Sequence, residues 1–302
     1  MDLVICNTPL QAIQIENLIK NGILKKGNFE LIFFIYNETE KLKHYYNRLS
    51  KLSYSSLYYK YEKFPFYVLK LKKLFNKKNY NSIYTASIDN KLTHYILSFS
   101  DYNYLYTIDD GTANIWVSSS YYIERNNIVK SAIHYLLGCR FNLKKTKEKT
   151  KHHYTIYKDF PNIVKNTIYN DIFDKKNNSS YNGKSINIFL GTVYDEVTNE
   201  KENLINDLSD LFSKYEFHYI PHPRDNGHYF LNVKYIEDNR ISEEIISTIF
   251  DKYEHINLYG FGSSVQYNLL NIPGINNYQI ESKYLKNTIS IANGLINKIN
   301  LN

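Results

Sequence analysis

Residues 186–212 read INIFLGTVYDEVTNEKENLINDLSDLF, and this stretch decides the fold class. Its apolar start, Ile186 to Leu190, predicts a buried strand, and a helix is predicted over 200–212 after a polar loop. The alternation continues with a strand at Phe217–Ile220, a helix at Ser242–Phe250 capped by Ser242, a strand at Ile256–Tyr259 and a short helix through Leu269 and Leu270. Strands that alternate with helices indicate an α/β fold with a parallel sheet.

The first half of the chain shows the same alternation. Strands are predicted at Leu3–Cys6, Leu31–Tyr36, Ser82–Thr85 and Leu105–Ile108, with a helix around Leu92–Phe99. Residues 174–184 read DKKNNSSYNGK, a composition typical of a linker. We therefore predict two Rossmann-like domains facing a cleft, over residues 1–175 and 185–302.

Composition narrows the class of protein. The chain has 302 residues, 43% hydrophobic and 22% charged, which are values typical of globular proteins. Net charge is +7, and lysines cluster at Lys70, Lys72, Lys73, Lys77 and Lys78 and at Lys144, Lys145, Lys147, Lys149 and Lys151. Such clusters are usually solvated faces, but they also suit an anionic membrane surface. No nucleic-acid-binding motif is present, so nucleic acid is not an expected partner.

The compartment is inferred from what the sequence lacks. Two distant cysteines, Cys6 and Cys139, make neither a disulfide framework nor a zinc site. The N-terminus lacks the pattern of a signal peptide, and no apolar stretch is long enough to span a membrane. We expect a cytoplasmic protein, with peripheral contact to the inner face of the cytoplasmic membrane as a further hypothesis.

Polar loops follow three predicted strands of the second half. They contain Gly191-Thr192, then His222 between Pro221 and Pro223, and then Gly262-Ser263-Ser264. Because ligands bind at the carboxyl ends of parallel strands, these loops are predicted to converge on a ligand. The glycines and serines suit a phosphate, although a Gly/Ser turn often only caps a helix. His222 can donate a proton, and Asp195 can accept one or simply cap a helix.

The first half offers one candidate, Asp109-Asp110-Gly111, directly after a predicted strand. Adjacent carboxylates suggest a metal site, but neighbouring side chains of an extended segment point in opposite directions. We therefore expect one carboxylate to hold the loop and the other to face the cleft. The other candidate ligands, His94, His134 and the His152-His153 pair, lack metal-site spacing, so no metal or other cofactor is expected.

Several short motifs, in this order, resemble glycosyltransferase family 52, the bacterial lipooligosaccharide sialyltransferases. They are Leu3-Val4-Ile5-Cys6-Asn7-Thr8-Pro9-Leu10-Gln11, Asp109-Asp110-Gly111-Thr112-Ala113-Asn114, Ser118-Ser119-Ser120-Tyr121, His153-Tyr154-Thr155-Ile156-Tyr157-Lys158, Leu190-Gly191-Thr192 with Asp195, Pro221-His222-Pro223-Arg224, and Ile236-Glu237-Asp238. The double serine Ser263-Ser264 is closer to related sialyltransferase families. The resemblance spans residues 3–270.

The resemblance implies a GT-B-type fold and inverting, metal-independent transfer from CMP-sialic acid to a galactose-type hydroxyl of a surface glycan. It implies that His222 is the general acid and Asp195 the general base. Asp110 is the competing base, and Glu196 is an alternative alignment for Asp195. Donor-binding residues would be Gly191, Thr192, Pro223, Arg224, Gly262, Ser263 and Ser264, and acceptor-side residues Thr8, Gln11, Asp109 and Gly111. A homodimer with exchanged segments is also implied.

Two alternatives remain at this stage. One is a glycosyltransferase of the same fold that uses another nucleotide sugar. The other is a non-catalytic protein that binds a glycan or a nucleotide.

Overall fold

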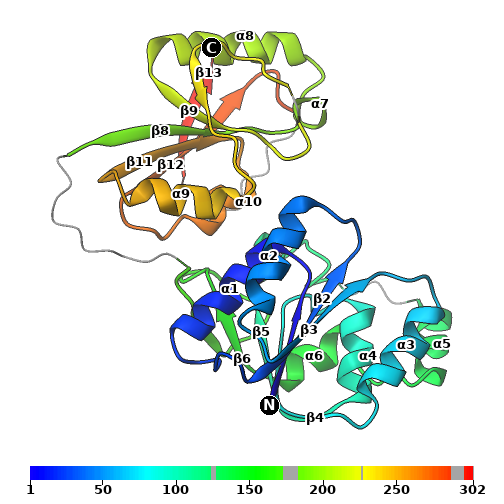
Figure 1. Cartoon of the computed structure of the whole chain (residues 1–302). Coiled ribbons are helices and arrows are strands. Elements are labelled where there is room, and N and C mark those ends of the chain that lie inside the picture. The colour runs from blue at the N-terminus through cyan, green and yellow to red at the C-terminus, as the bar shows by residue number, and fades with distance from the viewer. Residues whose placement is uncertain (124–126, 173–182, 226, 287–295, 302) are drawn as a thin grey trace. The chain divides into compact units, whose positions relative to one another are not determined.

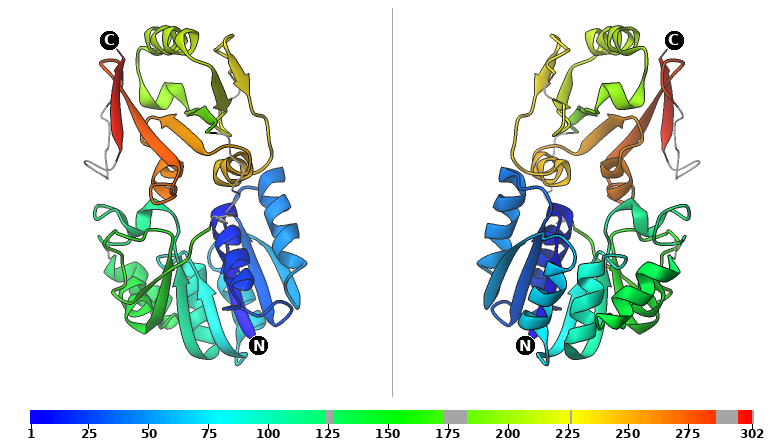
Figure 2. Two further views of the ribbon diagram at one scale, coloured as in Figure 1. Left: turned by 90° about the vertical axis from the view of Figure 1, so that its left-hand side faces the viewer. Right: turned by 90° about the vertical axis from the view of Figure 1, so that its right-hand side faces the viewer.

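The computed structural model describes residues 1–123, 127–172, 183–225, 227–286 and 296–301. The chain divides into two compact units, Met1–Ile172 and Phe173–Asn302. The predicted linker at 174–184 lies almost wholly outside the described residues. Each unit contains one parallel sheet with helices on both faces, as Figures 1 and 2 show.

The first unit is built on a seven-stranded sheet in the order β3-β2-β1-β4-β5-β6-β7. Its elements are β1 (Asp2–Cys6), α1 (Pro9–Lys20), β2 (Phe29–Ile35), α2 (Glu40–Ser50), β3 (Ser55–Lys60), α3 (Phe66–Phe75), β4 (Asn79–Thr85), α4 (Lys91–Phe99), β5 (Asp101–Ile108), η1 (Thr112–Asn114), α5 (Ile128–Leu136), α6 (Leu143–Lys149), β6 (Thr150–Thr155) and β7 (Thr167–Tyr169). The second element of the alternation, α1, begins at Pro9 because Thr8 caps it and proline suits the first helical position.

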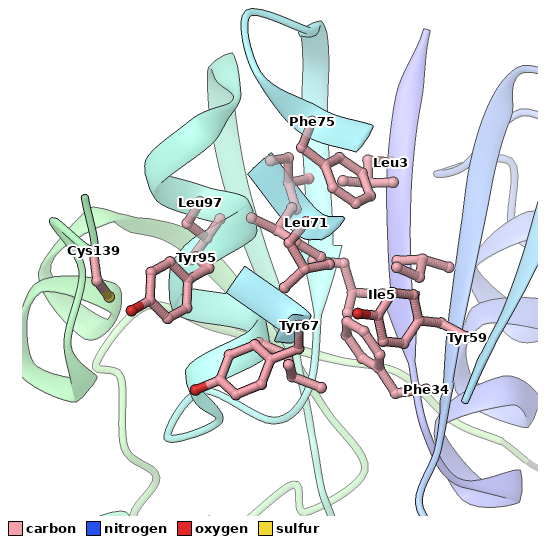
Figure 3. Close-up of a cluster of buried hydrophobic side chains, with 14 of the residues drawn as sticks. Leu3, Ile5, Phe34, Tyr59, Tyr67, Leu71, Phe75, Tyr95, Leu97 and Cys139 are labelled. Atoms are coloured by element: carbon pink, nitrogen blue, oxygen red, sulfur yellow. The ribbon is translucent and has the colours of Figure 1, made fainter. Parts of the chain in front are cut away.

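The central strands of this sheet are buried on both faces. All five residues of β1 are buried, as expected for a parallel sheet covered by helices on both sides. Leu3 and Ile5 point to the face covered by α3 and α4, where they pack with Leu71 and Tyr95 (Figure 3). On the other face, Phe33 of β2 meets Tyr46 of α2 with ring centroids 6.0 Å apart.

The second unit is built on a six-stranded parallel sheet in the order β10-β9-β8-β11-β12-β13. Its elements are β8 (Ser185–Leu190), α7 (Tyr194–Val197), α8 (Lys201–Lys214), β9 (Phe217–Ile220), β10 (Val233–Tyr235), α9 (Ser242–Phe250), β11 (His255–Gly260), α10 (Ser264–Asn268), β12 (Ile275–Ser282) and β13 (Asn297–Leu301). The core beneath α8 is aromatic: Phe189 stacks on Tyr219 with a 5.8 Å centroid separation, and Phe212 of α8 meets Phe189 edge-on.

Two local predictions in this unit were wrong. Ser242 is the first residue of α9 rather than its cap; Ile241 holds the cap position and makes no side-chain capping bond. The helix after Ser263 ends at Asn268, before Leu269 and Leu270. Within the described residues, no helix is long and apolar enough to cross a membrane.

The order of strands reverses at one position in each sheet, the kind of position where open α/β sheets usually bind ligands. In the first unit the chain runs outward from β1 to β3 and then returns to place β4 on the other side of β1. In the second unit it does the same, with β8 and β11 at the reversal. In open α/β sheets generally, the loops that leave two such strands part to opposite faces, and ligands bind between them at the carboxyl edge.

Candidate functional site

In the first unit, a carboxylate lies at the edge of the sheet where β1 and β4 reverse. Asp110 follows β5, and its oxygens accept hydrogen bonds from the Gln11 amide at 2.5 Å, the Tyr121 hydroxyl at 2.6 Å and the Ser87 hydroxyl at 3.1 Å. These donors come from α1, from the loop after β4 and from the segment after η1. Three separate stretches of chain therefore fix one partly buried carboxylate.

The environment of Asp110 changes its acidity. Burial raises the pKa of its carboxyl above the usual range, and the hydrogen bonds from Tyr121, Gln11 and Ser87 oppose this rise because they favour the charged form. Burial, together with the negative charge of the same carboxylate, raises the pKa of the Tyr121 hydroxyl, which therefore remains a donor at neutral pH. A carboxyl with a raised pKa at a sheet edge is suited to accept a proton.

Asp109 has the other role expected for the pair. It is fully buried, and its oxygens accept hydrogen bonds from the backbone N–H of Ile156 at 2.6 Å and from Asn162 at 3.3 Å. It also lies 2.8 Å from Nε2 of the fully buried His153, whose Nδ1 meets Thr107 at 2.7 Å. Asp109 therefore ties the loop to β6, and the prediction that one carboxylate holds the loop is confirmed.

The conformation of this loop depends on glycine. Gly111 has φ = 83°, in a region that side chains disfavour, and it turns the chain into η1 directly after Asp110. The Asp110 N–H donates to the side chain of the buried Asn114 at 2.7 Å, which closes the turn. Trp116, the single tryptophan of the chain, follows on the same loop, and its backbone N–H donates to the Thr112 carbonyl at 3.0 Å.

The other two predicted acceptor-side side chains, Thr8 and Gln11, form hydrogen bonds at the start of α1. The Thr8 hydroxyl accepts from the Gln11 N–H at 3.3 Å and caps α1. The buried Gln11 side chain accepts from the Asn7 N–H at 2.8 Å while it donates to Asp110. The sequence did not predict Ser87, which belongs to none of the motifs. Tyr121 lies in the motif Ser118-Ser119-Ser120-Tyr121, but no role was predicted for it.

In the second unit, the three polar loops leave adjacent strands, as predicted. Strands β9, β8 and β11 are neighbours in that order, so the segments that follow Ile220, Leu190 and Gly260 share one edge. The Gly191 N–H donates to the Ile220 carbonyl at 2.8 Å, which joins the first two. A Cβ at Gly191 would lie 2.6 Å from the Tyr219 hydroxyl, so the close approach requires glycine here.

His222 lies at this edge, partly buried between Pro221 and Pro223. Its Nδ1 accepts from the backbone N–H of Arg224 at 3.2 Å, which in the neutral ring leaves the proton on Nε2. The Arg224 guanidinium binds both oxygens of Glu196, at 2.8 and 3.0 Å, and so connects the β9 loop to α7. Glu196 is thereby engaged on both oxygens.

Asp195 is the most exposed of the candidate carboxylates. Its side chain is 75% exposed, and Oδ2 lies 3.2 Å from Nζ of Lys201. The Lys286 ammonium donates to the backbone carbonyl of Asp195 at 3.1 Å. Both contacts place positive charge beside this turn of α7.

The Gly262-Ser263-Ser264 turn differs from its sequence interpretation in one respect. The N–H groups of Gly262 and Ser263, expected to face a phosphate, both donate to the Gln266 side chain, at 2.9 and 3.2 Å. The Ser263 hydroxyl accepts from the Gln266 N–H, completing a capping box for α10. Ser264 is exposed. Within the described ranges, His, Cys, Asp and Glu side chains form no cluster of three or more that suits a metal ion.

Comparison with solved structures identifies the fold class. A putative UDP-N-acetylglucosamine 2-epimerase from Listeria monocytogenes superposes with a TM-score of 0.53 at 10% identity, over 92% of this chain and 78% of that one. The glycotransferase of kitacinnamycin gives the same TM-score and identity, over 99% and 86%. At this identity the likeness concerns the fold alone, which is of the GT-B type predicted.

Sequence comparison identifies the family. A sialyltransferase named CMP-N-acetylneuraminate:beta-galactoside alpha-2,3-sialyltransferase, from Pasteurella multocida, is 28% identical over 277 residues, covering 90% of this chain and 88% of its own. An N-acetyllactosaminide alpha-2,3-sialyltransferase from Haemophilus influenzae is 27% identical over 282 residues, covering 91% and 90%. The family model for glycosyltransferase family 52 matches residues 26–284. The chain therefore belongs to glycosyltransferase family 52, as its motifs predicted.

Proposed function

We propose that this glycosyltransferase moves sialic acid from CMP-sialic acid to a terminal galactose-type hydroxyl of a bacterial surface glycan, in lipooligosaccharide or capsule synthesis. Its main support is the edge of the second sheet, where Gly191-Thr192, His222 and Ser264 follow three adjacent strands. By its name, the Pasteurella multocida relative uses CMP-N-acetylneuraminate and a β-galactoside. The Haemophilus influenzae relative, by its name, acts on an N-acetyllactosaminide. No metal or other cofactor takes part in the proposed reaction.

The reaction we propose is a single inverting displacement. The acceptor hydroxyl oxygen attacks the anomeric carbon as the bond from that carbon to the CMP phosphate breaks, and a carboxylate takes the hydroxyl proton. His222 assists the departing phosphate through its Nε2 proton, since Nδ1 is engaged with Arg224. Gly191, Thr192, Pro223, Arg224, Gly262, Ser263 and Ser264 form the proposed donor side. Thr8, Gln11 and Gly111 form the acceptor side, and the buried Asp109 holds the loop that carries Gly111.

Two carboxylates compete for the role of base. Asp110 has a raised pKa and three fixed donors, whereas Asp195 is exposed and paired with Lys201. The Asp110→Asn and Asp195→Asn variants separate them through the pH dependence of kcat/KM. The variant that lacks the true base loses the acidic limb of the profile, and the other retains it.

The donor is tested by supplying CMP-sialic acid, UDP-sugars and GDP-sugars separately and measuring transfer and hydrolysis. We expect turnover of CMP-sialic acid and no turnover of the UDP- or GDP-sugars. Turnover of a UDP- or GDP-sugar in its place would overturn the proposed donor while leaving the family assignment intact.

His222→Ala distinguishes catalysis from simple binding. We expect kcat to fall by about 100-fold or more, the scale of general acid–base catalysis, while CMP remains bound. His255→Ala is the matched control, because His255 begins β11 at the opposite edge of the same sheet. Unchanged turnover in His222→Ala would remove this histidine from the mechanism.

The proposal also includes two kinds of contact. A homodimer is expected from the family resemblance, and sedimentation velocity tests it. Peripheral contact with the membrane is expected from the lysine clusters.

A further inference from the structure

Helix α5 has an apolar face that nothing in the described chain covers. None of its nine residues is buried. Ile128, Val129, Ile133 and Leu136 lie on one side at helical spacing, and Ile128 and Leu136 are each 83% exposed. Leucine and isoleucine exposed singly are common, but a continuous apolar helix face marks an interaction site.

Helix α3, close to α5 in the fold, exposes a second pair of apolar side chains. Phe66 and Leu69 are 65% and 63% exposed, and Lys70 and Lys73 share their side of the helix. The segment that leads into α3 reaches α5 through Phe64, whose ring lies 5.5 Å from that of His134. Both helices lie on the same flank of the first unit (Figure 1). We call this the α3–α5 surface, made of Phe66, Leu69, Ile128, Val129, Ile133 and Leu136.

Positive charge is concentrated around this surface. Residues 61–78 and 127–151, which contain α3, α5 and α6, have 13 of the chain's 37 basic residues but only two of its 30 acidic ones. The rest of the chain is slightly acidic, with 24 basic and 28 acidic residues. Arg140 stacks over Tyr135 of α5 at 3.9 Å, so a guanidinium lies directly on this helix. Lys70 is partly neutralised, since it pairs with Glu62.

We propose that the α3–α5 surface docks the protein onto an anionic lipid bilayer. An amphipathic helix that exposes isoleucine and leucine beside lysine and arginine can lie in the headgroup region, with its apolar face buried and its cations against acidic lipids. A second copy of the chain fits this surface less well. A twofold dimer would set the same patch against itself and bring the two basic rims together.

This inference deepens the membrane contact proposed above, yet its readout is lipid binding rather than sugar transfer, so the two can fail separately. The full chain is sedimented with vesicles that contain phosphatidylglycerol and with vesicles of phosphatidylcholine alone. We expect binding to the anionic vesicles only, and weaker binding as salt is raised.

Variants assign the binding to this surface. Ile128→Asn/Leu136→Asn is expected to reduce vesicle binding by about tenfold or more, since two exposed apolar anchors are lost. Leu231→Asn is the control, because Leu231 is 99% exposed in the second unit. Lys73→Gln/Lys130→Gln should also weaken binding, whereas Lys25→Gln/Lys26→Gln, of equal charge change, should not.

Two results would overturn the inference. One is equal binding of the native chain and Ile128→Asn/Leu136→Asn to anionic vesicles. The other is no vesicle binding together with a dimer in sedimentation velocity that this variant dissociates, which would assign the α3–α5 surface to a second copy.

Discussion

At the scale of single residues, the contacts of Asp109 and Tyr121 show that the two adjacent carboxylates of this loop, Asp109 and Asp110, have different environments. Asp109 has a structural role, because its oxygens contact His153, Asn162 and the Ile156 N–H in the core. Asp110 remains at the sheet edge, where Tyr121 supplies a hydrogen bond of 2.6 Å. A carboxylate held in this way is oriented by its donors before any substrate arrives.

Tyr121→Phe tests this tuning, given Asp110 as the base. The lost hydrogen bond stabilised the charged carboxylate, so the Asp110 pKa should rise further and the acidic limb of kcat/KM should move to higher pH by about one to two units. Tyr122→Phe is the matched control, because its hydroxyl donates to the Asn114 carbonyl at 2.7 Å and not to Asp110. A limb that stays in place in Tyr121→Phe would contradict a tuning role.

The candidate site was only partly predictable from single residues. Asp110, His222 and Gly191 follow apolar runs, so the rule that ligands bind at strand ends identified them. Ser87 follows a strand too, but only the order of strands puts β4 between β1 and β5 and so brings Ser87 to Asp110. The engagement of Gly262 and Ser263 by Gln266 follows the Ser-x-x-Gln pattern of a capping box, a signal that the phosphate interpretation of this turn did not use.

At the scale of elements, buried apolar strands were predictable and polar ones were not. β1, β2, β8 and β9 are apolar runs and match their predictions to within a few residues. β12 was missed, because it contains the buried polar residues Asn277 and Gln279. β6 was missed because Lys151, His152 and His153 break the apolar pattern, although His153 is buried against Asp109.

The junction of β8 and β9 supports a prediction about stability. Gly191→Ala places a methyl group 2.6 Å from the Tyr219 hydroxyl, and we expect the free energy of unfolding to fall by about 1–3 kcal/mol. In a Tyr219→Phe background the cost should be smaller but not zero, because the ring carbon Cζ would still lie 2.9 Å away. Calorimetry on the two single variants and the double variant completes the cycle. Equal costs in both backgrounds would show that the strain lies elsewhere.

At the scale of the whole molecule, the proposed roles divide between two units. Each unit has its own sheet, its own core and its own reversal of strand order. All the residues proposed to bind the donor belong to the second unit, and those on the acceptor side belong to the first. Binding of the two substrates can therefore be perturbed separately by mutation.

This division predicts a nucleotide-specific stabilisation. CMP at 100 times its dissociation constant should stabilise the unit that binds it by about 2.7 kcal/mol and raise its melting temperature, while UDP and GDP at the same concentration should have little effect. Asp110→Asn, in the other unit, should keep the CMP response. Calorimetric scans measure the shift, and a larger response to UDP than to CMP would point to a different donor.

The single tryptophan gives this molecule an optical reporter that needs no label. Trp116 lies on the loop that begins with Asp109 and Asp110, and its backbone N–H donates to the Thr112 carbonyl. Excited at the red edge of the absorption band, where the 31 tyrosines contribute little, it emits alone. Its emission wavelength therefore follows the polarity around the proposed acceptor loop, so acceptor and donor binding can be distinguished in real time by fluorescence.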